Sequence, residues 1–326
     1  MRIAKVLSIM LPFLSAVLPC QAQMNFLKFP DGVNAPYRAE KPLEAGDDQA
    51  EYAVIYIHGL NSKRLGDSSP TVKALLKKHP AARKTIVVTP MFYASTNCSD
   101  ELRGRIALWD TKAHDWRRGA ASLGENGVSS FAVIDRIYEL FSDRARYPKL
   151  RRIFLCGFSA GGQVVNRYIA VGKFVRAEHL EYAFAVGGPS TYLYIDGRRP
   201  MPDGTFRVPE PPVPGFDVWH DGLKDRNAYS ADLSDAAIMA NLASRPTLFM
   251  CGTEDVKRAG LVVTPGAMTQ GENRYRRFLN YQRYIALFPE WAKRCRFVGV
   301  PGFGHQWSRV FAAPEFLRFA YGERDK

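Results

Sequence analysis

A glycine-rich segment around a serine places the strongest local constraint on this chain. Residues 157–162 are Gly-Phe-Ser-Ala-Gly-Gly. The apolar run 152–156 before them has the length and composition of a buried strand, and apolar residues recur at helical spacing over 163–171. Glycine lets the backbone turn sharply and lets other main chain approach closely. The segment therefore predicts a strand, a tight turn and a helix in succession.

Other apolar runs extend this alternation along the chain. Strands are predicted at 52–57, 85–89, 182–186, 247–251 and 296–300, and helices at 72–78, 131–141, 272–288 and 308–319. Short strands that alternate with helices favour an α/β fold, in which helices cover both faces of a mostly parallel sheet.

Two stretches interrupt the alternation. Residues 91–127 show no sustained periodicity, and a long loop of this kind in a compact domain is usually functional or mobile. Residues 196–235 are rich in proline, glycine and charge, so they cannot form a regular core element. We expect the second stretch to be an excursion over one face of the sheet, as a cap or lid.

The N-terminus has the pattern of a signal peptide. Arg2 and Lys5 precede a mostly apolar run over 6–18, which is too short to span a membrane, and small or neutral residues lead to Ala22. An uncleaved anchor and lipidation at Cys20 are the alternatives; the preceding proline disfavours lipidation. Removal of 22 of the 326 residues leaves 304, which we expect to form one domain at 23–326, in the periplasm or outside the cell.

The chain is basic, with a formal net charge of +13 that falls to +11 once Arg2 and Lys5 are removed. The basic residues lie in small scattered clusters without the interleaved aromatic residues of a nucleic-acid platform, so no nucleic-acid partner is predicted. Basicity in an exported protein favours contact with anionic envelope surfaces or attraction of acidic substrates. A solvated basic surface without a specific partner explains it equally well.

Four cysteines follow residue 22, namely Cys98, Cys156, Cys251 and Cys295. An oxidising compartment permits disulfides, and four cysteines allow three pairings. Cys156 and Cys251 lie in strand-like runs, where cysteine often acts as a small buried hydrophobic residue. The pairing is therefore left open. No CxxC or histidine-rich spacing indicates a zinc site, and no metal or cofactor is predicted.

The glycine-rich segment also has a chemical interpretation. The pattern Gly157-x-Ser159-x-Gly161 between a strand and a helix is typical of a nucleophilic serine raised on a sharp turn. A serine hydroxyl needs a base, and the base needs an orienting group. Functional groups gather at the carboxyl ends of parallel strands, and Asp255 and His305 each follow a predicted strand there.

Several residues compete for the roles of base and acid. Of the six histidines, only His305 follows the last strand and has flexible glycines, Gly302 and Gly304, directly before it, although His114 and His220 could approach the cleft. Glu254 competes with Asp255 for the role of acid, and the turn Gly-Thr-Glu-Asp at 252–255 favours Asp255.

A developing oxyanion needs backbone donors fixed in advance. Ala160 supplies the N–H directly after the serine. The second donor is expected in the loop after the 52–57 strand, at the N–H of Leu60, where His58 is interpreted as a structural turn residue.

On these motifs, and on the order serine, aspartate, histidine, the chain resembles the α/β-hydrolase superfamily, and more narrowly secreted single-domain esterases and polyester-depolymerase-like hydrolases. The resemblance implies an eight-stranded, mostly parallel sheet, no cofactor and an ester substrate. The first strands of that fold are hard to locate before Tyr52, so we expect a shortened sheet. Aromatic residues that could line an acyl or aryl pocket, although core packing explains each of them as well, are Tyr93, Trp109, Trp116 and Tyr192.

The sequence therefore predicts an exported serine hydrolase that cleaves a carboxylic ester through Ser159, His305 and Asp255. Amide or peptide cleavage by the same residues is the nearest alternative, because the three side chains do not discriminate between the two bonds. A binding protein that uses the fold without catalysis is the alternative from another class.

Overall fold

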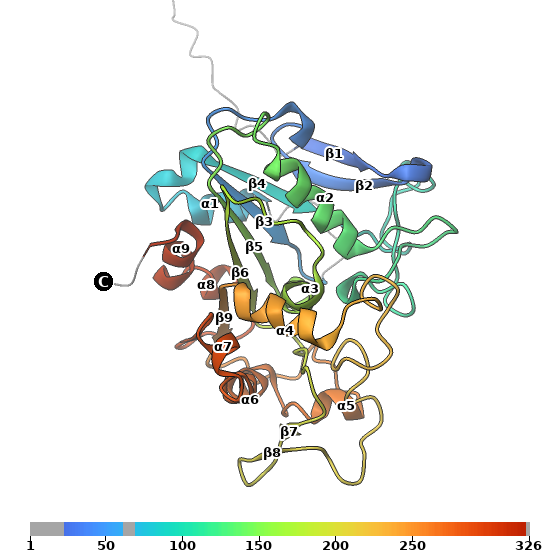
Figure 1. The fold of residues 1–326 in the computed structure, drawn as a ribbon, viewed down its shortest axis with the longest axis vertical. Coiled ribbons are helices and arrows are strands. Elements are labelled where there is room, and N and C mark those ends of the chain that lie inside the picture. The colour runs from blue at the N-terminus through green and yellow to red at the C-terminus, as the bar shows by residue number, and fades with distance from the viewer. Residues whose placement is uncertain (1–22, 61–68, 324–326) are drawn as a thin grey trace, which may run out of the picture.

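A computed structural model describes residues 23–60 and 69–323 of the chain. Its centre is an eight-stranded sheet (Figure 1). Across the sheet the strands are β1 (Gln23–Lys28), β2 (Asn34–Ala39), β4 (Thr85–Pro90), β3 (Tyr52–Ile57), β5 (Arg152–Phe158), β6 (Glu181–Gly187), β9 (Thr247–Gly252) and β10 (Cys295–Val300). Strands β4, β3, β5, β6, β9 and β10 are mutually parallel, and β1 and β2 are antiparallel additions at one edge. The α/β architecture is confirmed.

The expectation of a shortened sheet was wrong, because β1 and β2 form a hairpin before Tyr52. The short 3-10 helix η1 (Pro30–Gly32) joins them, and β2 pairs with β4 only through Tyr37 and Arg38. An edge hairpin buries only part of its side chains, here Leu27 and Tyr37 among others. It therefore carries polar residues between apolar ones and lacks the continuous apolar run of a central strand.

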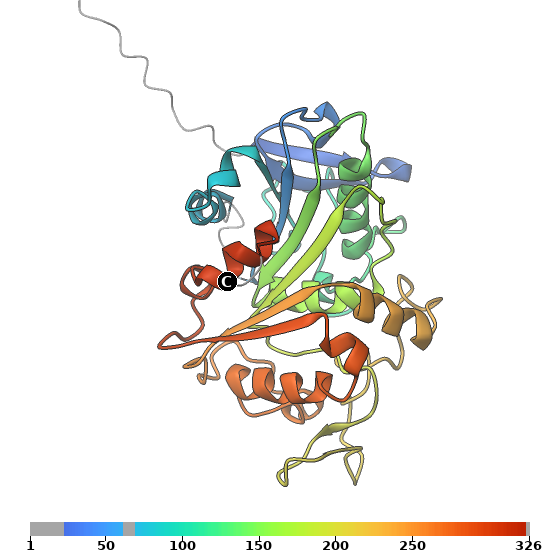
Figure 2. The ribbon, with the colours of Figure 1, turned by 60° about the vertical axis from the view of Figure 1, so that its left-hand side comes forward.

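Helices cover both faces of the sheet, as Figures 1 and 2 show. One face carries α1 (Ser69–Leu76), α8 (Trp307–Val310) and α9 (Pro314–Tyr321). The other carries α2 (Ser130–Ser142), α3 (Ala160–Val171), α4 (Asp235–Ser244) and α6 (Arg274–Ile285). Strand β3 shows why both faces are needed: Val54 and Tyr56 pack in the first layer, and Ala53, Ile55 and Ile57 in the second. Alternate side chains of a strand point to opposite faces, so both must be apolar.

Two helix predictions differ from the structure. The helix expected at 308–319 is split into α8 and α9, because Pro314 has no N–H to continue a helix but suits the first turn of a new one. Helix α4 was not predicted at all. Its buried side chains are only Ile238 and Leu242, which is too few to produce a clear helical period.

The remaining elements are short. They are η2 (Leu43–Ala45), η4 (Pro80–Lys84), η5 (Trp116–Arg118), β7 (Arg199–Pro200), β8 (Phe206–Arg207), α5 (Pro265–Met268) and α7 (Pro289–Ala292). Strands β7 and β8 pair within the excursion 196–235 and form the part that projects at the bottom of Figure 1. All four cysteines in the described residues have free thiols.

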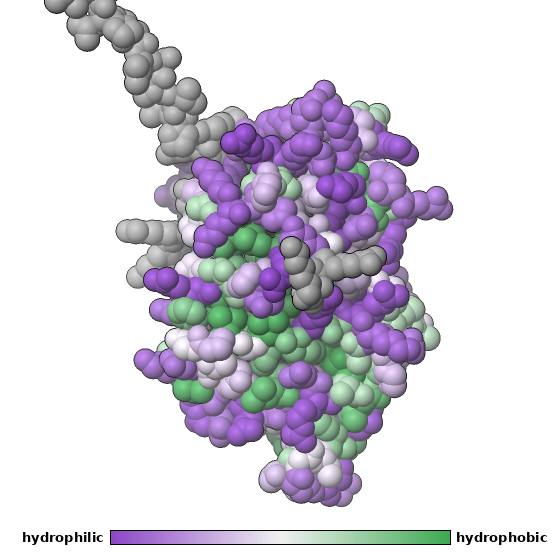
Figure 3. All heavy atoms as spheres, turned by 90° about the vertical axis from the view of Figure 1, so that its left-hand side faces the viewer, coloured by the Kyte–Doolittle hydropathy of each residue, from purple (hydrophilic) through white to green (hydrophobic). Residues whose placement is uncertain are grey.

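The surface is mostly polar but not uniformly so. On the face that Figure 3 presents, hydrophilic residues dominate the upper part and the rim, and apolar residues gather toward the middle. Among the residues that the structure describes, no helix combines the length and the apolar character needed to cross a bilayer. The expected signal peptide at 1–22 lies outside the described residues.

Candidate active site

Ser159 lies at the junction of β5 and α3 with an uncommon backbone conformation. Its φ is 57° and its ψ −116°, a region that side-chain-bearing residues rarely occupy. The conformation makes the chain reverse sharply between the strand and the helix. The serine thus stands at the carboxyl end of the sheet and at the N-terminus of a twelve-residue helix.

Close backbone contacts explain the glycines around Ser159. A Cβ atom added to Gly161 would lie 2.1 Å from the carbonyl oxygen of Ile57 and 2.8 Å from that of His58. A Cβ atom added to Gly157 would lie 2.5 Å from the backbone of Gly161. Since no side chain fits at these distances, the glycines let α3 begin directly against the end of β3.

The structure brings the three predicted catalytic residues together. Nε2 of His305 lies 2.9 Å from Oγ of Ser159, and Nδ1 of His305 lies 2.6 Å from Oδ2 of Asp255. Asp255 is 1% exposed and follows β9, whereas His305 follows β10 and contacts the ring of Phe158. Three strand ends that are far apart in sequence therefore supply one hydrogen-bonded chain of groups.

The chemistry of Asp255 fixes which atoms donate in these two hydrogen bonds. A carboxylate only accepts hydrogen bonds, so Nδ1 of His305 carries the proton toward Asp255. Nε2 is then the unprotonated nitrogen, and it accepts a hydrogen bond from the hydroxyl of Ser159. This arrangement suits an imidazole that takes a proton from the serine while the carboxylate holds the ring in place.

The competing acid, Glu254, is not part of this arrangement. Its side chain is exposed, and its backbone N–H donates to the carbonyl of Phe303 at 3.0 Å. Behind Asp255 lies Arg274, which is 2% exposed and whose Nη1 is 3.7 Å from Oδ1 of Asp255. Arg274 also donates to the carbonyls of Ala259 and Gly260, so it ties the loop after β9 to the buried carboxylate.

His58 has the supporting position that its sequence context predicts. It is 5% exposed, its Nδ1 lies 2.8 Å from the carbonyl oxygen of Gly59, and its Nε2 accepts from the N–H of Phe92 at 3.0 Å. Burial lowers the pKa of His58 to about 4, so the ring is neutral at neutral pH. The Nε2 bond links the end of β3 to the segment after β4, and the Nδ1 contact stays within the turn after β3, so neither ring nitrogen is left for proton transfer.

The two predicted oxyanion donors lie on adjoining segments. Ala160 is the first residue of α3, where a backbone N–H has no partner within the helix. Leu60 follows Gly59, whose added Cβ would lie 3.8 Å from the carbonyl of Phe158, so this loop runs beside the turn that carries Ser159. The side chain of Leu60 is 44% exposed.

The four aromatic residues proposed for a pocket are all buried. Trp109, Trp116 and Tyr192 belong to the main hydrophobic core, and Tyr93 belongs to a smaller cluster with Met91, Cys98 and Ile106. Trp109 is completely buried, and its indole N–H donates to the carbonyl of Ala120. The structure therefore shows all four residues packed against other side chains of these two clusters.

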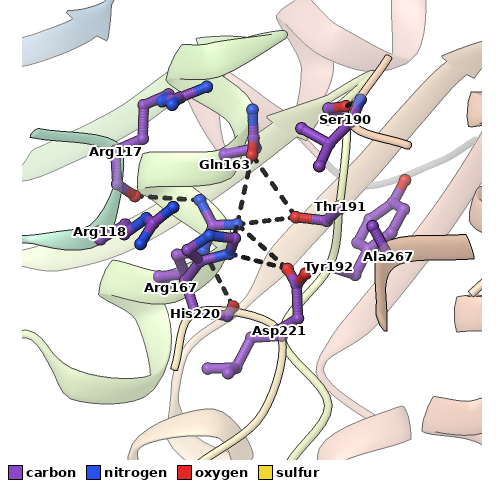
Figure 4. Close-up of polar contacts among 12 residues, drawn as sticks. Arg117, Arg118, Gln163, Arg167, Ser190, Thr191, Tyr192, His220, Asp221 and Ala267 are labelled. Atoms are coloured by element: carbon purple, nitrogen blue, oxygen red, sulfur yellow. Dashed lines mark hydrogen bonds and ion pairs between the residues drawn. The ribbon is translucent and has the colours of Figure 1, made fainter. Parts of the chain in front are cut away.

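Sequence reasoning missed a group of polar and charged residues around Arg167 of α3. Gln163 and Arg167 follow Ser159 at helical spacing, and both side chains are buried. Figure 4 shows Gln163, Thr191 and His220 around the guanidinium of Arg167. The sequence offered one signal, the Arg117-Arg118 pair in the irregular stretch, which contributes a backbone carbonyl to this group.

Groups of three or more histidine, cysteine, aspartate or glutamate side chains that could hold a metal ion were not found in the part of the chain that the structure describes. The arrangement at Ser159 consists of organic groups that can transfer a proton and stabilise an anion. It suits attack of the serine on an electrophilic carbonyl.

The strand order, the sharp turn at Ser159 and the positions of Asp255 and His305 after β9 and β10 define the α/β-hydrolase fold. Similar solved structures include the poly(3-hydroxybutyrate) depolymerase LpqC from Bordetella parapertussis, with 19% sequence identity, a TM-score of 0.60 and coverage of 94% of this chain and 92% of that one. Poly(aspartic acid) hydrolase-1 from Sphingomonas sp. KT-1 has the same identity and TM-score, with coverage of 93% and 100%. No protein-family model and no curated protein sequence matches the chain.

Proposed function

We propose that this protein is a serine hydrolase that cleaves carboxylic esters through an acyl-enzyme. The observation that supports the proposal most directly is the continuous set of hydrogen bonds from Ser159 through His305 to the buried Asp255. Both partners of His305 lie at distances suited to proton transfer.

In the proposed reaction, Oγ of Ser159 attacks the ester carbonyl while Nε2 of His305 takes the hydroxyl proton. The oxygen of the tetrahedral intermediate accepts from the N–H groups of Ala160 and Leu60, and the positive end of α3 favours its negative charge. His305 then protonates the departing alkoxide. Water attacks the acyl-enzyme by the same route in reverse, which releases the acid and restores Ser159.

Two of the solved structures similar in fold are named for polymer hydrolysis, one as a poly(3-hydroxybutyrate) depolymerase and one as a poly(aspartic acid) hydrolase. Their names make esters, including polyesters, the first substrates to test. The N-terminal pattern of residues 1–22 adds the proposal that the protein acts after export. Mass determination of the N-terminus of protein recovered from the periplasm or medium tests that part; a start at Met1 would contradict it.

The proposed reaction is tested with a fluorophosphonate probe and with p-nitrophenyl esters of varied acyl length. We expect labelling at Ser159, and loss of ester hydrolysis by a factor of about 10⁶ in Ser159→Ala. Ser308→Ala is the matched control, because Ser308 is an exposed serine on α8, close to His305 but outside the hydrogen-bonded set. Hydrolysis that survives Ser159→Ala would disprove the proposal, and p-nitroanilides run alongside measure the preference for esters over amides.

A further inference from the structure

A cavity of about 310 Å³ lies beside α3, between the loop at 115–118 and the 214–221 part of the excursion. Gln163 lines it and lies one helical turn beyond Ser159, to whose carbonyl oxygen its N–H donates at 3.0 Å. One turn of helix advances about 5.4 Å. The cavity therefore begins within roughly one turn of the proposed nucleophile, close enough to hold another part of the same substrate molecule.

One pair of charges in the cavity wall is internally balanced. Nη2 of Arg167 lies 3.6 Å from Oδ1 of Asp221, and both side chains are buried. Burial lowers the pKa of Arg167 to about 10, so the guanidinium remains charged at neutral pH. Burial also lowers the pKa of His220, which leaves its ring neutral there. This part of the wall contributes one positive and one negative charge.

The remaining charges are not balanced, because Arg117 and Arg118 share one carboxylate. Nε of Arg117 lies 2.8 Å from Oδ1 and its Nη2 2.6 Å from Oδ2 of Asp115, so Arg117 engages both carboxylate oxygens. Nε of Arg118 lies 3.2 Å from Oδ2 of Asp115 but makes no hydrogen bond with the described residues. Within the described residues, no hydrogen bond from Nη1 or Nη2 of Arg118 is found. The six charged or titratable side chains of the lining thus carry one surplus positive charge, on Arg118.

The main chain of Arg118 is held in place although its side chain is 37% exposed. The indole N–H of Trp219 donates to its carbonyl oxygen at 2.9 Å, and Nδ2 of Asn227 donates to the same oxygen at 2.7 Å. Trp219, Val218 and Pro214 supply an apolar wall next to it. An unsatisfied guanidinium fork beside an apolar wall suits a carboxylate that is attached to a hydrocarbon chain or ring.

We propose that this cavity, here called the basic cavity, binds a carboxylate of the substrate, with Arg118 as its main ligand. The preferred substrates are then esters that carry a free carboxylate, such as half-esters of dicarboxylic acids or acidic ends of oligomers. This inference rests on the proposed ester hydrolysis at Ser159. The positive net charge, which is +13 for the full chain and +11 without Arg2 and Lys5, acts in the same direction, since it draws anions toward the protein.

The test compares charged and neutral esters of the same size. Mono-p-nitrophenyl esters of adipic and suberic acid are paired with p-nitrophenyl hexanoate and octanoate, and 4-acetoxybenzoate is paired with 4-acetoxytoluene to place the charge on the leaving group. We expect the ratio of kcat/KM for the charged ester over its neutral partner to exceed one in at least one pair. In Arg118→Gln that ratio falls by about 10- to 100-fold, the usual range for a charge-assisted hydrogen-bonded pair.

Arg144→Gln is the control, because it removes the same charge from an exposed position before β5, at the opposite end of the sheet. If the ratio of kcat/KM fell equally in Arg144→Gln and Arg118→Gln, general attraction of anions by the positive net charge would explain it and the proposal would be overturned. An unchanged ratio in Arg118→Gln would also overturn it. Calorimetric titration of Ser159→Ala with suberate tests carboxylate binding in the basic cavity separately from ester hydrolysis at Ser159. Binding that disappears in Ser159→Ala/Arg118→Gln supports the basic cavity even if no ester is hydrolysed, whereas absent binding contradicts it even if esters are cleaved.

Discussion

The buried His58 makes the stability of the protein depend on pH in a way that one substitution can isolate. In the folded chain its pKa is about 4, because burial disfavours the charged ring, while its ordinary value is 6.5. Between these two values the unfolded chain binds a proton at this residue and the folded chain does not. The free energy of unfolding therefore falls as the pH is lowered below the ordinary pKa.

The magnitude follows from the separation of the two pKa values. Each pH unit within the window changes the free energy of unfolding by about 1.4 kcal/mol. Lowering the pH from about 7.5 to about 4.5 should therefore cost roughly 2.5 kcal/mol through His58 alone. His220, whose pKa burial also lowers, acts in the same direction but is present in both proteins compared.

The assay is urea unfolding of the wild type and of His58→Gln over this pH range. The glutamine oxygen can still accept from the N–H of Phe92, but the side chain does not titrate. We expect His58→Gln to be less stable at neutral pH and the difference from wild type to shrink by roughly 2.5 kcal/mol on acidification. His114→Gln, which removes an imidazole that is only half-buried, is the control. A difference between wild type and His58→Gln that does not vary with pH would refute the reasoning.

Two further predictions concern the site. Asp255→Asn should lower kcat by about 10⁴-fold because the imidazole loses the partner that fixes its tautomer, whereas Glu254→Gln should stay within a few-fold of wild type. Ester kinetics of the two variants measure this, and a larger loss of kcat in Glu254→Gln would make Glu254 the acid. Gly161→Ala should destabilise the fold by about 3 kcal/mol or more, since its Cβ would meet the carbonyl of Ile57 at 2.1 Å. Gly299→Ala, whose Cβ would have ordinary contacts at 3.5 Å or beyond, should unfold at the wild-type urea concentration or above it; equal behaviour of the two variants would count against the steric argument.

Most of the sheet could be predicted because its central strands are continuous apolar runs buried on both faces. The edge hairpin could not, since a strand such as Gln23–Lys28 mixes buried and exposed positions. The placement of Ser159, Asp255 and His305 followed from a simple rule, that parallel strands deliver the residues after them to one edge of the sheet. No comparable rule predicts where the aromatic residues lie. A tryptophan in an irregular stretch can line a ligand site or fill the core, and Trp109 fills the core.

The basic cavity escaped sequence reasoning for a different reason. Its balance of charge depends on which carboxylate pairs with which guanidinium, and one of these pairs joins distant segments. Asp221 is far along the chain from Arg167, whereas Asp115 lies beside Arg117 and Arg118. Adjacent basic residues indicate only a positive surface. The surplus charge becomes visible only when the excursion is folded against α3.

Helix α3 connects the proposed nucleophile to that cavity. Ser159, Gln163 and Arg167 are spaced four residues apart, so they follow one another along one side of the helix. The contact of Gly161 with the end of β3 fixes where the helix starts, and each four-residue step advances about 6 Å. Arg118 itself stands on η5, whose backbone is tied to α3 because Nη1 of Arg167 donates to the carbonyl of Arg117 at 3.0 Å. The separation between the reacting carbonyl and the carboxylate site is thus set by α3 and by this contact. If the basic cavity binds the substrate carboxylate, the dependence of kcat/KM on diacid length should show a distinct optimum. A flat length dependence would indicate that the carboxylate is not held at a fixed distance from Ser159.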